Sequence, residues 1–107
     1  MDINDKNILN IALKRHLEWG KEMLIPLETK LLKDIPNIST DDLKKLVDYI
    51  KNISKDILWK IYYSNYDRKT NELKTNTVSE IKNKYPWIDE ENLKTLHLQG
   101  MYYAWHG

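Results

Sequence analysis

The sequence predicts an all-α protein, a four-helix assembly in which two long helices carry a shorter C-terminal pair. The 107 residues include only three glycines and three prolines, so few positions interrupt regular structure. Apolar residues recur at the three- and four-residue spacing of helices, and the alternation expected of strands is hard to find. A chain of this length is typical of one domain with a modest core. We therefore expect residues 1–107 to form a single helical domain.

The first helix is predicted over about residues 5–33, with Asp5 as its N-cap. Its inner face carries Leu9, Leu13, His16, Gly20, Met23, Leu24, Leu27 and Leu31. Pro26 removes a backbone donor and clashes with the preceding turn. Because the apolar face keeps its phase across Pro26, we expect a kink there, with a break into two helices as the alternative. Gly20 on this face would let another helix approach closely.

The second helix is predicted over residues 40–66, with Ser39 or Thr40 as its cap. Its core-facing stripe comprises Leu43, Leu46, Val47, Ile50, Ile53, Ile57, Leu58 and Ile61, all within roughly 80° on a helical wheel. The connection over residues 34–38 is short. Short connections make neighbouring helices antiparallel, so the two long helices should form a helical hairpin.

The reverse side of the second helix becomes aromatic near its end. Trp59, Tyr63 and Tyr66 lie about 140–200° from Leu43, nearly opposite the stripe. We favour burial of these rings under a later segment, because large aromatic side chains bury much apolar area. The alternative is an exposed docking patch.

The remaining segments are shorter. Residues 67–76 are polar and mixed in charge, and we interpret them as a mobile loop. A short helix is predicted over residues 78–85, where Thr77 and Glu80 match a capping box. Both this helix and the next should pack on the hairpin.

The last helix is predicted over residues 90–106, with Asp89 as its cap. Gly100 and Ala104 are small and one turn apart, which allows close contact with another helix. This helix is our candidate for covering the aromatic side of the second one.

Composition argues against several functions. The formal charge is +1, from 17 basic and 16 acidic side chains, so no strong field attracts nucleic acid or an anionic membrane. The chain contains no cysteine, which excludes disulfides and thiolate metal sites. The N-terminal stretch lacks a signal-peptide pattern, and no apolar run approaches the roughly 18 residues of a membrane span. We expect a soluble, cytoplasmic protein.

Catalysis finds no support in the sequence, and we expect neither an enzyme nor a cofactor. Nucleophile motifs and glycine-rich phosphate loops are missing. His16 and His97 both fall on predicted inner faces, so a small-ligand or metal site between the first and last helices is an alternative function. A metal needs at least three ligands, and no ligand spacing supplies the others. Nucleic-acid binding by the C-terminal helix pair is a weaker alternative, because Glu90 and Glu91 would repel phosphate at the start of a recognition helix.

Binding to another protein is the function that we favour. Aromatic residues gather in the second half, and all are Trp or Tyr: Tyr62, Tyr63, Tyr66, Tyr85, Trp87, Tyr102, Tyr103 and Trp105, besides Trp59. These types dominate interface energetics. The predicted partner-binding residues are Trp59, Tyr63, Tyr66, Tyr102 and Trp105. Immunity proteins, antitoxins and adaptors are analogies from fold class alone, and a homodimer is left open.

Overall fold

The computed structural model describes residues 2–106 and confirms the all-α class. Within this part, the strands belong to one two-stranded sheet. Contacts divide the chain into two compact units, Met1–Asn52 and Ile53–Gly107, and each is described by itself. That the two units make up a single domain stays a prediction.

The first unit holds α1 (Lys6–His16), the 3-10 helix η1 (Gly20–Leu24), α2 (Leu27–Asp34) and most of α3 (Thr40–Lys55). Asp5 caps α1 as predicted, since its carboxylate accepts hydrogen bonds from the Asn7 amide at 2.8 Å and the Ile8 amide at 3.3 Å. The buried apolar side chains of this unit are Leu9, Ala12, Leu13, Leu17, Leu27, Leu31, Ile35, Ile38, Leu43, Leu46, Val47 and Ile50.

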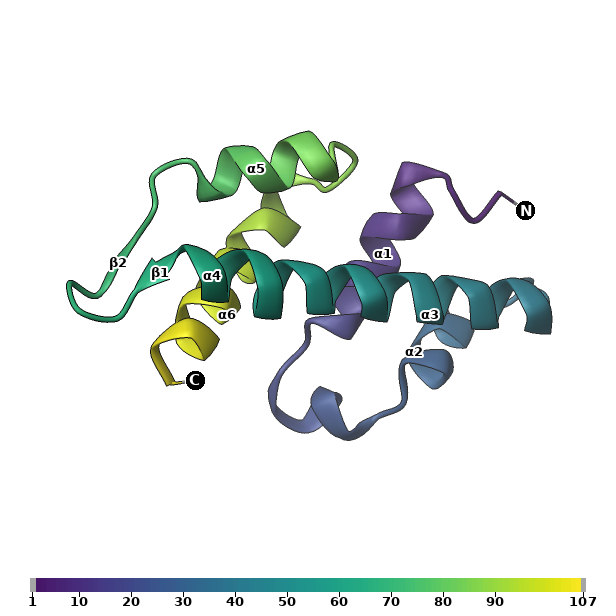
Figure 1. The fold of residues 1–107 in the computed structure, drawn as a ribbon. Helices are drawn as coiled ribbons and strands as arrows, with labels where there is room; N and C mark the ends of the chain where they lie inside the picture. Colours follow the sequence, from purple (N-terminus) through teal and green to yellow (C-terminus); the bar gives the residue numbers. More distant parts are fainter. Residues whose placement is uncertain (1, 107) are drawn as a thin grey trace. The chain divides into compact units, whose positions relative to one another are not determined.

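The expectation of one kinked helix over residues 5–33 is wrong. α1 ends at His16, and η1 forms a separate short turn on the connection to α2 (Figure 1). Gly20 has a φ of +79°, which a helix cannot contain and which favours glycine. Ile25 is extended, with φ −86° and ψ 128°, as expected of a residue before proline. The phase match across Pro26 was therefore coincidental.

Two further expectations for this segment are corrected. A Cβ atom built on Gly20 would meet nothing within 4 Å, so this glycine serves a backbone turn rather than a helix contact. Met23 is 58% exposed and Leu24 is 86% exposed, although both were assigned to the inner face. The helical wheel assigned these two side chains to the wrong face because the residues between positions 17 and 26 do not continue the α-helix.

Polar contacts join the ends of α1 and α2. Arg15 donates to both carboxylate oxygens of Asp34, from Nε at 2.7 Å and from Nη2 at 3.0 Å. These bonds hold the pKa of Asp34 below its usual value, although burial acts in the opposite direction. Lys30, only 4% exposed, donates from Nζ to the Arg15 carbonyl at 3.0 Å and lies 3.4 Å from Glu18. The buried lysine therefore caps the C-terminal end of α1.

The second predicted helix is confirmed. Helical backbone runs from Thr40 through α3, η2 (Asp56–Tyr62) and α4 (Tyr63–Asn65). Ser39 accepts a hydrogen bond from the Asp42 amide at 3.1 Å. The segment η2 is π-helical, so a turn holds an extra residue and the side chains beyond it rotate by up to about 100° relative to a regular wheel. This rotation buries Tyr62, which is 1% exposed.

The second unit continues with a hairpin and two helices. β1 (Tyr66–Asp67) pairs antiparallel with β2 (Glu72–Leu73), and the hairpin projects beyond the end of α4 before leading to α5 (Figure 1). The predicted loop over residues 67–76 thus contains β2 and the second residue of β1, and sequence patterning missed both strands. Its predicted mobility stays a prediction.

The two C-terminal helices match their predicted positions within one residue: α5 spans Thr77–Lys84 and α6 spans Glu90–His106. Asp89 caps α6 through its bond from the Asn92 amide at 2.8 Å. The predicted capping box is wrong, because the Thr77 hydroxyl donates to the Lys74 carbonyl at 2.7 Å. Asn76 occupies the N-cap position of α5.

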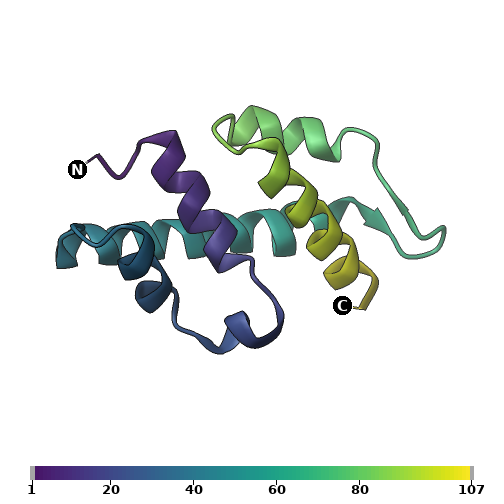
Figure 2. The same ribbon diagram turned by 180° about the vertical axis from the view of Figure 1, so that it is seen from behind.

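α6 packs across η2 (Figure 2). A Cβ atom at Gly100 would overlap the ring of Tyr62, so the helices meet where α6 has no side chain. The buried apolar side chains of this unit are Ile53, Ile57, Leu58, Ile61, Tyr62, Ile81, Ile88, Leu93, Leu96 and Ala104. The small residues of α6 thus make the close helix contact that the sequence predicted.

Gly100→Ala should lower the free energy of unfolding by about 1–3 kcal/mol, the usual cost of overpacking, despite the better helix propensity of alanine. Urea unfolding of the wild type and of the variant measures this change in the free energy of unfolding. Lys94→Ala, at an exposed position of the same helix, is the control and should change stability by less than about 0.5 kcal/mol.

A double-mutant cycle assigns the cost to the aromatic ring. In a Tyr62→Leu background the methyl group at position 100 meets a smaller side chain, so the penalty of Gly100→Ala should shrink. An equal penalty in both backgrounds contradicts the assignment.

Candidate functional site

The candidate site is a set of exposed aromatic side chains on the second unit. Of the five predicted partner-binding residues, four are exposed: Trp59 by 47%, Tyr63 by 41%, Tyr102 by 48% and Trp105 by 63%. Tyr66 is half-buried in β1. The favoured expectation, that a later segment would bury Trp59 and Tyr63, is therefore wrong. The π-helical turn instead directs Tyr62 towards α6.

Ring contacts connect η2 to the C-terminal end of α6. Trp59 lies 4.8 Å from Tyr103, and Tyr103 lies 5.6 Å from Tyr102, measured between ring centroids. His106 lies 4.2 Å from Tyr102 and 4.6 Å from Trp105. We call these five side chains the aromatic surface. Tyr103 and His106 were absent from the predicted site, although Tyr103 belongs to the aromatic residues that gather in the second half of the sequence.

Tyr63 and Tyr66 belong to the hairpin end of the unit. Arg68 donates from Nη2 to the Tyr63 hydroxyl at 2.6 Å, and its guanidinium carbon lies 4.8 Å from the centre of the Tyr63 ring. The Tyr66 hydroxyl donates to Asn71 Oδ1 at 3.2 Å. Their phenol groups therefore hold hairpin residues, whereas the aromatic surface lies between Trp59 and the end of α6.

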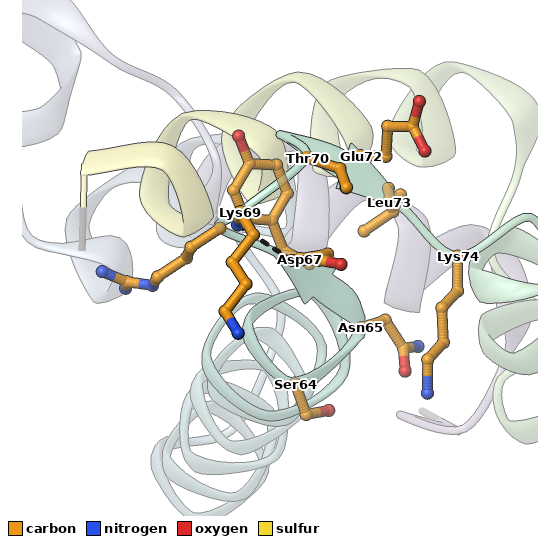
Figure 3. Close-up of a pocket in the computed structure, with 10 residues that line it drawn as sticks. Ser64, Asn65, Asp67, Lys69, Thr70, Glu72, Leu73 and Lys74 are labelled. Carbon is orange, nitrogen blue, oxygen red and sulfur yellow. Dashed lines mark hydrogen bonds between the residues drawn. The ribbon is translucent and has the colours of Figure 1, made fainter.

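The hairpin encloses an open hollow of about 670 Å³, lined by residues 64–70 and 72–74 (Figure 3). Asp67 accepts a hydrogen bond from the Lys69 amide at 2.8 Å, which shapes the turn. The lining mixes both charge signs, with Asp67 and Glu72 against Arg68, Lys69 and Lys74. This mixture favours no particular charge of ligand.

Tyr62 and His97 form a polar contact at the edge of the unit's core. Tyr62 Oη lies 3.1 Å from His97 Nδ1, and the rings meet edge to face. Burial raises the pKa of Tyr62 to about 12, so the phenol stays protonated near neutral pH and can donate to Nδ1. A ligand of His97 Nδ1 would have to displace this hydrogen bond.

A second polar contact links α5 to η2. Asp56 Oδ2 accepts from the Tyr85 hydroxyl at 2.6 Å and lies 2.7 Å from Lys84 Nζ. Burial alone would raise the pKa of Asp56, but the hydrogen bonds from Lys84 and Tyr85 lower it. The carboxylate therefore stays ionised and fastens α5 in place.

His16 and His97 fall in different compact units, and the small-ligand site predicted around them stays a prediction. His16 ends α1 and is half-buried. Burial lowers its pKa, and the charges of Lys51 and Lys30 act in the same direction. Among residues 2–106, no three His, Cys, Asp or Glu side chains come close enough to hold a metal ion.

A separate exposed apolar set lies on the first unit. Trp19 is 45% exposed and adjoins η1, which buries none of its five residues and exposes Met23 and Leu24. Met and Leu side chains here keep their rotamer freedom, which a binding event must restrict. The rings of the aromatic surface contact one another, so packing limits the rotamers of their side chains.

Comparison with protein-family models, with curated proteins and with solved structures gave no match. In the part of the chain from residue 2 to residue 106, no helix has both the length and the apolar character needed to cross a membrane.

Acidification should destabilise the protein partly through His16. Because its pKa is lowered in the folded state, the unfolded chain binds a proton first as the pH falls below about 6.5. The stability that neutral His16 contributes above about pH 6.5 is then lost as the pH falls towards the pKa of His16 in the folded protein. Urea unfolding between about pH 7.5 and about pH 5.5 should show a smaller pH-dependent loss for His16→Gln than for the wild type. Parallel pH profiles for the two proteins would contradict the assignment.

Proposed function

We propose that this protein is non-catalytic and works by binding another protein through the aromatic surface. The observation that carries the proposal is the chain of ring contacts that joins exposed Trp59, through half-buried Tyr103, to exposed Tyr102, His106 and Trp105. Large exposed apolar patches on a small domain mark interaction sites. Trp and Tyr are also the residues most enriched among those that dominate binding energy.

The arrangement of the rings supports the proposal. Trp59 and Tyr103 come from different helices of one unit and lie in contact, so packing limits the rotamers of both side chains. A surface ordered before binding loses less conformational entropy on association. Tyr hydroxyls and the Trp indole N–H additionally supply hydrogen-bond donors at the rim of such a contact. Both features favour a protein partner with an apolar anchor and polar surroundings.

Charge supports a protein partner over nucleic acid. The formal charge of the chain is +1, and α6 begins with Glu90 and Glu91, which nucleic-acid phosphates would repel. In this proposal the protein acts as immunity proteins, antitoxins or adaptors do, by binding one other protein. The comparison with these classes is an analogy from fold class alone. A cytoplasmic location belongs to the same proposal.

Trp59→Ala should weaken capture of the partner strongly. Removing an aromatic anchor at the centre of an interface costs about 2 kcal/mol or more, roughly a 30-fold loss of affinity. Affinity capture from extracts of the source cells, with mass spectrometry and then titration calorimetry on the captured protein, measures the loss. Thermal unfolding of the variant establishes that it is folded.

Trp19→Ala is the matched control, because Trp19 is 45% exposed against 47% for Trp59 and lies on the other unit. The control should capture the same protein at wild-type yield. Equal capture by the wild type and by folded Trp59→Ala would contradict the proposed function.

A further inference from the structure

α6 is apolar on two opposite faces in its C-terminal two-thirds. Its inner face is buried and includes Leu93, Leu96, Gly100 and Ala104. Leu98 lies about 200° around the helix from Gly100 and is 71% exposed, the largest exposure of any apolar side chain in this unit's described residues. A helix that is apolar all round is normally buried all round. From Leu98 to Trp105, the outer face of α6 therefore has the composition of a covered surface.

The outer face is symmetric in spacing about Leu98. The residues within about 40° of Leu98 on a helical wheel are Glu91, Lys94, Tyr102 and Trp105. With Leu98 included, the five positions are three, four, four and three residues apart, the spacing that a helix gives to any one face. If an identical helix lies antiparallel with Leu98 against Leu98, Lys94 faces Tyr102 and Glu91 faces Trp105. Such a contact uses the same patch on both chains, as a two-fold dimer requires.

The chemistry of the facing residues fits the antiparallel pairing. An ammonium group over a tyrosine ring is a favourable cation–π contact, which suits Lys94 and Tyr102. A carboxylate accepts from an indole N–H, which suits Glu91 and Trp105. In a parallel pairing Glu91 would face Glu91 and Lys94 would face Lys94, and the like charges would repel. The two helix dipoles also oppose each other in the antiparallel arrangement.

A groove beside the outer face can receive the tryptophan of a second copy. It has a volume of about 460 Å³ and lies between α5 and the first half of α6. Its lining is Val78, Glu90, Leu93, Lys94, His97 and Leu98. Antiparallel pairing brings Trp105 of the second copy to the level of Glu91, next to this groove. Trp105 is 63% exposed, so burying its indole in an apolar groove would add hydrophobic stabilisation twice per dimer.

We propose that the outer face of α6 binds a second copy of this chain, antiparallel about Leu98, with each Trp105 in the groove of the other copy. The contact is one helix face about 25 Å long, from 17 residues, plus two grooves. A strip about 25 Å long and about 10 Å wide, the diameter of a helix, is well below the roughly 800 Å² per partner of a stable complex. The dimer is therefore weak and dissociates on dilution.

Sedimentation equilibrium of the full chain tests the dimer, from about 1 µM to about 1 mM, the range in which weak interfaces dissociate. The wild type should pass from monomer to dimer, and Leu98→Glu should stay monomeric throughout. Leu24→Glu is the matched control, because Leu24 is 86% exposed on the first unit, and it should associate like the wild type. A monomeric wild type at every concentration, or equal association of Leu98→Glu, overturns the proposal.

Disulfide trapping tests the register. The chain contains no cysteine, so a single introduced cysteine reports only contacts between copies. Leu98→Cys should form linked dimers much faster than Leu24→Cys, because a disulfide needs Cα atoms about 4.4–6.8 Å apart. Mixed Lys94→Cys and Tyr102→Cys proteins should link to each other in preference to themselves. Equal rates at positions 98 and 24, or preferential self-linking at position 94, contradict the antiparallel contact.

The two proposals fail separately. Leu98→Glu leaves Trp59 and Tyr103 in place, so a monomeric variant should still capture the partner of the proposed function. A wild type that never dimerises but needs Trp59 for capture refutes only the dimer. If the wild type dimerises through Leu98 but Trp59→Ala does not change the capture of another protein, only the proposed binding by the aromatic surface is refuted.

Discussion

The contact between the Tyr62 ring and the backbone of Gly100 organises the second unit. Tyr62 is 1% exposed, and any side chain at position 100 would overlap its ring. The phenol needs a polar partner because burial leaves it protonated with a pKa of about 12, and His97 on the next turn of α6 supplies one at 3.1 Å. A large ring, a missing side chain and one hydrogen bond thus fix where α6 crosses η2 and how the helix is rotated.

That rotation determines what the unit presents to solvent. With Gly100 facing inward, Leu98 and Trp105 must face outward, and Tyr103 is carried to the side where it meets Trp59. The π-helical turn has a matching effect on the other helix, since it brings Tyr62 inward and leaves Trp59 and Tyr63 about half exposed. Both proposed surfaces are therefore consequences of one packing contact. Because Tyr102 and Trp105 contribute to both, a second copy on α6 and a partner on the aromatic surface would compete.

Helix positions could be predicted well where capping and apolar spacing agree. Asp5, Ser39 and Asp89 each cap a helix as expected, and the stripe from Leu43 to Ile61 is buried throughout. The prediction of one long first helix was wrong. Apolar residues kept helical spacing through a segment in which Gly20 and Pro26 impose non-helical backbone. The sequence identified Trp59, Tyr102 and Trp105, which the structure places on the aromatic surface, and that this surface binds a partner stays a prediction. A regular helical wheel cannot show an extra residue in a turn, so the burial of Tyr62 in place of Trp59 was missed.

The account depends most on the Tyr62–Gly100 contact, and proton NMR observes it directly. In a two-dimensional nuclear Overhauser spectrum of the wild type, the ring protons of Tyr62 should give strong cross-peaks to the α-protons of Gly100. Trp59 ring protons should instead give cross-peaks to the ring of Tyr103, which lies 4.8 Å away between centroids. Cross-peaks from Gly100 to the Trp59 ring, with none to Tyr62, would show that α6 meets the opposite side of η2 and would contradict the account.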